Sequence, residues 1–475
     1  MEQNGAVRQR PAWLLVAVLC AIGIIGSFQF TLLVPLVTVL PPILGESVGD
    51  VQWLVTVTLL MGAVSTPLFA RMADMFGRRR LLLLSLAFIA VGSLMAALSS
   101  SLWMLILARL VNGLSGGITP IGIALMRDQL PRHRLAFGIS LMTTTIGVGS
   151  AIGLPVSGWL NEAFGWQAGF WLSLVTSLVL MALVPLTISS AGVRTGGRFD
   201  WLGAILLSVA LTAMLLVISK GGSWGWASPP VIGLAVVAAA AFLLWLQAER
   251  RAADPLVALG TTFSRPILLT NASTFLTSLA MFGNMFITTA QLQVPVEAGG
   301  FGLSTLEAAS LMVPSSVALM AFSPVGGWLA GRLGARPLLM AGAVLTIAAY
   351  AWRLLALDSV PQIVLSTVVL SIGTAFSFAA TPLAIIAFAP AEETAQANGV
   401  NQVVRSIGAS VCSAIIAAAF GIVAHTAAGA AYPTTTAFLV IFWMAIGAAT
   451  VGAVVTAFIP RMPAPAEAPA EAVSP

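Results

Sequence analysis

The sequence has few charged residues, few cysteines and almost no histidine. Only 8% of its 475 residues are Asp, Glu, Lys or Arg, against about 25% in a soluble globular domain, so the chain lacks the charge that a water-exposed surface needs. Cys20 and Cys412 both lie in apolar runs, where small core residues are expected rather than a disulfide or a metal site. The two histidines, His133 and His425, also argue against a metal centre.

The sequence motifs of enzymes are missing as well. There is no Ser/His/Asp set or phosphate loop, and the longest loops, near 189–200 and 249–265, are too short to hold a catalytic domain. We therefore expect neither enzymatic activity nor a cofactor. A net charge of +5 is compatible with an anionic partner, but the placement of the basic residues in loops explains it better, and no nucleic acid is expected.

Long apolar runs are what the sequence has instead. Runs of roughly 18 or more apolar residues predict membrane-spanning helices, whereas the alternating pattern of a membrane β-barrel is missing. The first run is longer than the core of a signal peptide and has no cleavage site after it, so we interpret it as the first membrane helix. We expect about fourteen spans, namely 13–39, 51–70, 81–99, 102–126, 135–160, 167–188, 201–219, 231–248, 266–290, 305–329, 338–356, 361–388, 401–424 and 435–459.

The basic residues predict the orientation of these spans. With the N-terminus in the cytoplasm, every Lys and Arg falls in inward-facing segments except Lys220 and Arg353, placed outside, and Arg109 and Arg405, placed within spans. This asymmetry is what the positive-inside rule expects. We therefore predict a multi-pass protein of the inner or plasma membrane with both termini in the cytoplasm.

The two longer loops and an internal repeat divide the chain into two halves. Residues 70–80 and 327–336 share a small residue first, Ala fourth, Gly eighth and Arg tenth, and both follow an even-numbered span. Membrane transporters commonly contain such repeats. The expected parts are a cytoplasmic tail (1–12), an N-terminal six-helix bundle (13–188), a linker with two extra transmembrane helices (189–265), a C-terminal six-helix bundle (266–459) and a disordered cytoplasmic tail (460–475).

The loop after the second span carries a family signature. The segment ARMADMFGRRR (70–80) resembles the loop motif of the major facilitator superfamily, and Asp74, Gly77, Arg78 and Arg80 fall on its marked positions. The resemblance implies that these residues form a conformational latch, as they do in that family. The alternative is that the loop provides only charge balance and a tight turn at glycine.

The latch interpretation also needs a partner across the molecule. The resemblance implies that Asp74 meets the positive N-terminal end of the thirteenth helix in one conformation only. Arg405, about one turn into that helix, is the expected cationic partner. It lies in NGVNQVVRSIGAS (398–410), which resembles the start of the penultimate helix in fourteen-helix drug:proton antiporters.

The fifth span carries a second signature. GVGSAIGLPVSGWL (147–160) resembles the antiporter motif of the same superfamily at Gly149, Gly153 and Gly158, with Pro155 next to the usual proline position. Small residues at this spacing allow close helix packing, and proline favours a bend. Generic helix packing is an equally good explanation of the glycines.

Polar residues within spans are candidates for proton or substrate handling. Arg109, in a segment similar to the family's buried-arginine motif, is expected near the cavity. An arginine that extends towards the lipid headgroups is the alternative. Gln29, Asn112 and Asn284 are candidates for the cavity wall, although most such residues form hydrogen bonds between helices.

The chain departs from the antiporter family in one respect. Leu32 stands where the family's first helix usually carries an acid, and no acid falls in the middle of a span. A buried carboxylate is the usual proton carrier, so proton coupling would have to use Asp74, Glu307 or His425. Without such an acid we predict neutral, zwitterionic or anionic lipophilic substrates rather than multiply cationic ones.

The resemblance covers nearly the whole chain and implies an all-α major facilitator fold. We expect a monomeric transporter in the lipid bilayer that exports small lipophilic or amphipathic compounds by alternating access, coupled to protons. An uncoupled facilitator or importer of a specific metabolite, and a non-transporting membrane receptor, remain as alternatives.

Overall fold

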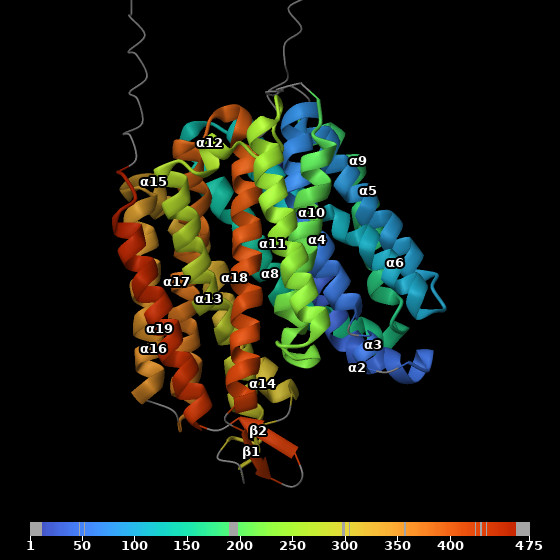
Figure 1. Ribbon diagram of the computed structural model, residues 1–475, viewed down its shortest axis with the longest axis vertical. Helices are drawn as coiled ribbons and strands as arrows, with labels where there is room; N and C mark the ends of the chain where they lie inside the picture. The colour runs from blue at the N-terminus through green and yellow to red at the C-terminus, as the bar shows by residue number, and fades with distance from the viewer. Residues whose placement is uncertain are drawn as a thin grey trace, which may run out of the picture.

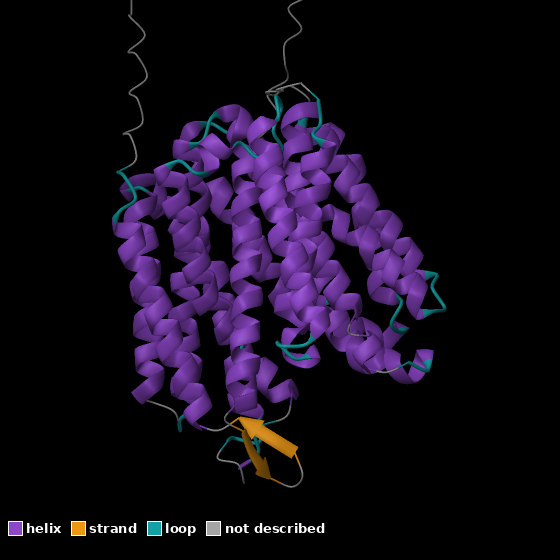
Figure 2. Ribbon diagram, in the orientation of Figure 1, coloured by secondary structure: helices purple, strands orange, loops and turns teal. Residues whose placement is uncertain are grey.

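The computed structural model describes residues 12–46, 48–51, 53–189, 198–296, 300–303, 305–355, 358–422, 424–427, 430–433 and 435–461. These residues form a bundle of long, roughly parallel helices (Figure 1), with one short strand pair at one end (Figure 2). Thirteen helical stretches are long and apolar enough to span a membrane. A fourteenth long helix, α8, has 33 residues. The predicted all-α polytopic fold is confirmed.

In chain order the elements are α1 (Ala12–Thr31), α2 (Leu33–Leu44), α3 (Val48–Val51), α4 (Trp53–Phe76), α5 (Arg78–Ala97), α6 (Leu102–Gly113), η1 (Leu114–Gly117), α7 (Ile118–Gln129), α8 (Arg132–Phe164), α9 (Ala168–Thr187), α10 (Trp201–Trp224), α11 (Pro229–Arg251), α12 (Leu259–Thr262), α13 (Arg265–Gln293), α14 (Thr305–Leu311), α15 (Val313–Leu333), α16 (Ala335–Leu355), α17 (Val360–Phe388), η3 (Ala391–Glu393), α18 (Thr394–Ile422), β1 (Ala424–Ala427), β2 (Ala430–Pro433) and α19 (Thr435–Ala457).

Three predicted spans are interrupted. The first divides at Leu32 into α1 and α2, where Pro35 has no N–H to bond to the Thr31 carbonyl. The fourth contains the 3₁₀ turn η1, and the tenth divides at Met312 into α14 and α15. The antiparallel hairpin of β1 and β2 was not predicted, because its few residues carry no long alternating pattern.

Two sets of six long helices form the main body. The N-terminal segment (residues 12–189) has one large apolar core, in which α1 packs on α8 and α9, and α5 packs on α6 and α9. In the C-terminal segment (residues 265–461), α13 packs on α18 and α19, and α17 packs on α15 and α16.

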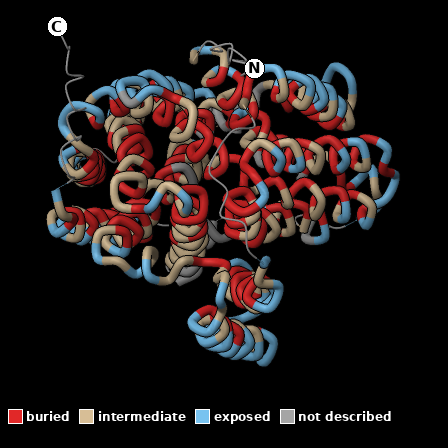
Figure 3. The backbone as a smooth tube through the Cα atoms, turned by 90° about the horizontal axis from the view of Figure 1, so that it is seen from above, coloured by how far each residue is buried: buried red, intermediate tan, exposed pale blue. Residues whose placement is uncertain are grey.

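The helices α10 and α11 form a pair beside these segments. They pack on each other, and α10 also contacts α4 and α18 through a cluster that includes Val64, Leu207 and Val403. Seen from above, this pair stands out from the rest of the bundle (Figure 3), and its helix α11 is largely exposed. The exposed side chains in residues 232–244 of α11, such as Phe242 and Leu243, are apolar, as a surface in contact with lipid tails requires.

One end of the bundle holds the start of α1, the end of α19 and the turn between α4 and α5, and we call it the terminal end (Figure 1). Near this end the two segments are in close contact. Ala70, Ala124 and Ala395 form one buried cluster between α4, α7 and α18. Between α15 and α8, Ser323 donates a hydrogen bond to the Ser140 carbonyl at 2.9 Å.

Candidate functional site

A single residue, Gly77, separates α4 from α5. Its backbone angles are φ 108° and ψ 124°, which residues with a Cβ rarely adopt. The turn leaves Asp74 and Arg78 four residues apart with their side chains together. Arg78 donates two hydrogen bonds to Asp74 Oδ1, from Nε at 3.0 Å and from Nη2 at 2.8 Å.

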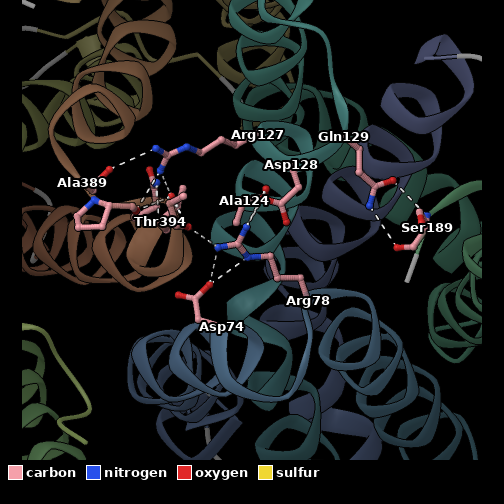
Figure 4. A network of polar contacts seen from close by, with 12 residues as sticks. Asp74, Arg78, Ala124, Arg127, Asp128, Gln129, Ser189, Ala389 and Thr394 are labelled. Carbon is pink, nitrogen blue, oxygen red and sulfur yellow. Dashed lines mark hydrogen bonds and ion pairs between the residues drawn. The ribbon is translucent and has the colours of Figure 1, made fainter. Parts of the chain in front are cut away.

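A second carboxylate faces the same guanidinium. Arg78 Nη1 lies 2.5 Å from Asp128 Oδ1 and donates to the Ala124 carbonyl at 3.3 Å, so α7 is joined to α4 and α5 (Figure 4). Asp74 and Arg78 are both buried. Burial of a carboxylate is costly unless it is paired, so this cation stabilises two acids at once.

The same residues contact the C-terminal segment. Arg78 Nη2 donates to the Ala391 carbonyl in η3 at 2.9 Å, and the backbone N–H of Gln396 donates to Asp74 Oδ2 at 3.1 Å. Gln396 lies in the first turn of α18, where N–H groups lack intrahelical partners and the helix dipole attracts anions. Asp74 therefore lies where the latch interpretation expects it.

Arg127 extends the network, although sequence reasoning did not single it out. It donates to the carbonyls of Pro390 at 3.1 Å and Ala389 at 3.3 Å, and to the hydroxyl of Thr394 (Figure 4). It thereby joins α7 to the end of α17 and the start of α18. In the sequence, the one indication of this role is that Arg127 lies next to Asp128 in the short loop between the fourth and fifth predicted spans.

Two residues of the expected latch lie elsewhere. Arg80 is exposed and has no part in this network among the described contacts. Arg405, expected beside Asp74, follows Gln396 by nine residues, or about 13.5 Å along the helix. Its guanidinium instead lies over the Phe378 ring, 4.2 Å from the centroid. The pairing with Asp74 fails because α18 begins at Thr394, seven residues before the predicted span, so Arg405 lies about three turns into the helix and far from its N-terminal end.

The glycines of the fifth span are not equivalent. A Cβ at Gly149 would lie 3.1 Å from the Ile24 carbonyl oxygen, and one at Gly153 would collide with the Thr31 hydroxyl, so both lie where α8 crosses α1 closely. Gly158 has no such neighbour. Helix α8 continues through Pro155, whose side chain is outside the described residues.

Arg109 is fully buried in the N-terminal segment. Its Nη2 donates to the Gln29 backbone carbonyl at 2.5 Å and its Nη1 to Gln29 Oε1 at 3.2 Å. Asn112 donates to the same Oε1, and the Phe170 ring covers the guanidinium at 5.5 Å. With no exposed surface, Arg109 does not extend to the headgroups. Of the cavity candidates, Gln29 is thus the partner of Arg109, and Asn112 shares that partner.

Arg353 was counted with the outward-facing segments, and the structure corrects this. It is a buried residue of α16, and it donates to Asn284 Oδ1 at 2.8 Å, Thr288 Oγ1 at 2.6 Å and Gln291 Oε1 at 3.0 Å. The three partners form one face of α13. Their i, i+4, i+7 spacing within an apolar span could have predicted a shared polar partner. Asn284 therefore lies beside Arg353 as one of its acceptors.

The described carboxylates all lie in loops or within two residues of a helix end. Glu307, a proton-carrier candidate, is an exposed residue of the short helix α14. The side chain of His425, another candidate, is outside the described residues. Asp74 is the buried carboxylate that combines contacts to both segments.

Comparisons with known proteins agree with this architecture. The family model described as Major Facilitator Superfamily matches residues 19–413 and 272–474. The chain is 29% identical over 379 residues to the tetracenomycin C resistance and export protein of Streptomyces glaucescens, covering 78% of this chain and 69% of the relative. It is 27% identical over 400 residues to the multidrug resistance protein Stp of Mycobacterium tuberculosis, covering 82% and 73%.

A solved structure resembles the same fold. The crystal structure of the human organic anion transporter MFSD10 superposes with a TM-score of 0.67, covering 94% of this chain and 99% of that one. At 15% sequence identity, the likeness concerns the arrangement of helices alone.

Proposed function

The chain belongs to the major facilitator superfamily of membrane transporters, and on that premise we propose that it exports small lipophilic or amphipathic compounds across the cell membrane by alternating access, in exchange for protons. The printed names of two relatives, a resistance and export protein and a multidrug resistance protein, support export. We further propose that it acts as a monomer.

The network around Asp74 carries the proposal of alternating access. It joins α4, α5 and α7 to η3 and α18 at the terminal end, through the bonds from Gln396 to Asp74 and from Arg78 to Ala391. Opening that end would break these bonds. Contacts made in one conformation only bias the equilibrium between conformations, so the network acts as a latch that keeps the terminal end closed.

The moving parts follow from the same contacts. We propose that residues 13–188 and 266–459 move as two bundles, with 189–265 as a linker that remains beside them. The excess of arginine at the terminal end, which includes Arg78 and Arg127, supports a cytoplasmic location of that end and of both termini. Export would then begin when the latch opens towards the cytoplasm.

The experiment is transport in liposomes under an imposed pH gradient, with a neutral lipophilic dye and the internal pH recorded together. We expect opposite movements of dye and protons. Asp74→Asn weakens the bonds to Arg78 and the α18 terminus, and should shift the conformational equilibrium by about 1–3 kcal/mol, with slower transport. Arg80→Gln, which changes a nearby exposed charge, should transport normally. Dye movement that ignores the gradient would refute proton exchange.

An uncoupled facilitator is the second candidate. It is favoured by the position of the described acids, which lie at helix ends or in loops rather than in the middle of spans. Proton carriers inside membranes are usually buried carboxylates. Dye that moves down its own gradient without a change in internal pH would establish this function in place of antiport.

A further inference from the structure

Arg405 is a buried cation with few partners. It follows the first residue of α18 by eleven positions, or about 16 Å along the helix, and only 5% of its surface is exposed. A guanidinium has five N–H donors. Among the described residues, Arg405 makes one hydrogen bond, from Nη2 to Asn401 Oδ1 at 3.5 Å, and its Nε is buried without a partner.

Two other buried arginines, Arg109 and Arg353, make more hydrogen bonds than Arg405 among the described residues. Arg109 has two bonds to Gln29 at 2.5 and 3.2 Å, and Arg353 has three bonds to α13 at 2.6 to 3.0 Å. Arg109 has no exposed surface and Arg353 has 1%. The Nε atoms of Arg109 and Arg353 are also buried without a partner among the described residues, but both Nη atoms of each guanidinium are bonded to amides, carbonyls or hydroxyls. At Arg405 only Nη2 has a bond within the described part of the chain, and that bond is long.

No described carboxylate balances the charge of Arg405. The acid that contacts α18, Asp74, is bonded at Gln396, about 13.5 Å away along the helix, and its own charge is matched by Arg78. An unpaired cation inside a membrane protein is costly and usually serves function. A counter-ion from outside the chain would remove that cost.

The surroundings of Arg405 suit the anionic end of a small molecule. Phe378 of α17 covers one face of the guanidinium, and Asn401 is oriented by its own bonds to Asn271 Oδ1 at 2.9 Å and Thr274 Oγ1 at 3.0 Å. Asn271, Thr274 and Phe378 keep 6–7% of their surfaces exposed although each lies within a long helix. A mainly apolar wall with a few convergent polar groups is typical of ligand sites.

We propose that Arg405 binds the carboxylate of an otherwise apolar substrate, with Asn401 as a positioning residue and Phe378 in contact with the apolar part. A guanidinium carries paired N–H donors in the geometry that a carboxylate accepts, and most of those of Arg405 have no partner among the described residues. This inference rests on the proposed export function and narrows its substrates to amphipathic monoanions.

Binding of two matched probes to the purified full chain in lipid nanodiscs tests the proposal. The probes are pyrenebutyric acid, which is an anion at neutral pH, and pyrenebutanol, which is neutral and nearly identical in shape. We expect the wild type to bind the anion more tightly. Arg405→Gln should weaken anion binding at least tenfold and change pyrenebutanol binding less than twofold, while Arg405→Lys should keep part of the preference.

A second variant keeps the test independent of the loss of arginine. Asn401→Asp places a carboxylate next to Arg405, which should occupy the guanidinium and reduce the preference for the anion at least fivefold without removing the cation. Asn398→Asp, one turn earlier on α18, is the matched control and should keep most of the preference. Its side chain bonds only locally, to the Thr394 carbonyl.

The outcomes separate the inference from the function on which it rests. Equal weakening of both probes in Arg405→Gln, or an unchanged preference in Asn401→Asp, would overturn the anion site. If the wild type binds pyrenebutanol and the anion with equal affinity, the anion site is overturned, but the proposed export of lipophilic compounds still stands. Wild type that binds neither probe would count against both.

Discussion

Arg78 and Arg109 are both buried in the N-terminal segment, but their environments differ in kind. Arg78 lies between two carboxylates near the terminal end and also contacts η3 of the C-terminal segment. Arg109 lies within the segment and is bonded to the backbone and side chain of one residue, Gln29, without an acid among its described partners. The first arginine is held by charge, the second by amide dipoles.

The difference indicates which contacts can change during transport. Every bond of Arg109 joins helices of the same segment, so it can persist while the segments move. The Arg78 network includes bonds to Ala391 and, through Asp74, to Gln396 across the two segments. Opening the terminal end must break those bonds. We therefore propose a switching role for Arg78 and a supporting role for Arg109.

The largest expected effect is that of Arg78→Ala. Without the guanidinium, the carboxylates of Asp74 and Asp128 stay partly or fully buried with no cation between them, and we expect a loss of about 3–5 kcal/mol in the free energy of unfolding. Denaturant unfolding in detergent measures it. The control Arg80→Ala removes an exposed positive charge nearby and should cost no more than about 0.5 kcal/mol. Equal losses would contradict the comparison.

Gln29→Leu should have the next largest effect. The substitution removes one acceptor from Arg109 but leaves the backbone carbonyl, and bonds to charged groups contribute about 1.5–3 kcal/mol each. We expect that loss in unfolding free energy, with no change in access to the terminal end as measured by cysteine labelling. Gln29→Glu, which keeps both acceptor atoms, should retain more stability. Increased labelling of the terminal end in Gln29→Leu would assign Arg109 to the switch.

A smaller effect is expected where α1 crosses α8. Gly153→Ala places a Cβ against the Thr31 hydroxyl and disturbs the helix that carries Gln29. We expect a loss of about 1 kcal/mol in the free energy of unfolding, which is the low end for overpacking because the Thr31 side chain can rotate. Gly158→Ala has open space and should instead be neutral or stabilising by up to about 1 kcal/mol. Thermal unfolding of the two variants compares them directly. The same loss in both would mean that close packing is irrelevant at Gly153.

The smallest expected quantity is the coupling between the two arginine sites. If they are independent, the losses from Arg78→Ala and Gln29→Leu should add in the double variant within about 0.5 kcal/mol. A double-mutant cycle of unfolding free energies measures the difference. A coupling above about 1 kcal/mol would show that both arginines belong to one cooperative unit, and the distinction between switch and support would fail.

The spans could be predicted because hydropathy is a local property. Each predicted span corresponds to a long helix or a pair of helices, and the loop motif placed Asp74, Gly77 and Arg78 at the turn between α4 and α5. The interruptions at Leu32 and Met312 were missed, since a proline shifts a helix end without changing the apolar character of the run. Arg353 was misplaced because it lies two residues from the end of α16, where sequence cannot distinguish a loop from a buried site.

By itself, the sequence determined the class of protein, the approximate number of its helices and the residues of one tight turn. These follow from composition, run length and the backbone freedom of glycine, which need no distant partner. Only the tertiary structure decided which polar residues meet. Gln29 and Arg109 are 80 residues apart, and Asp74 and Gln396 are 322 apart. Hydrogen bonds depend on distances within about 3.5 Å, so helix packing had to fix these pairs.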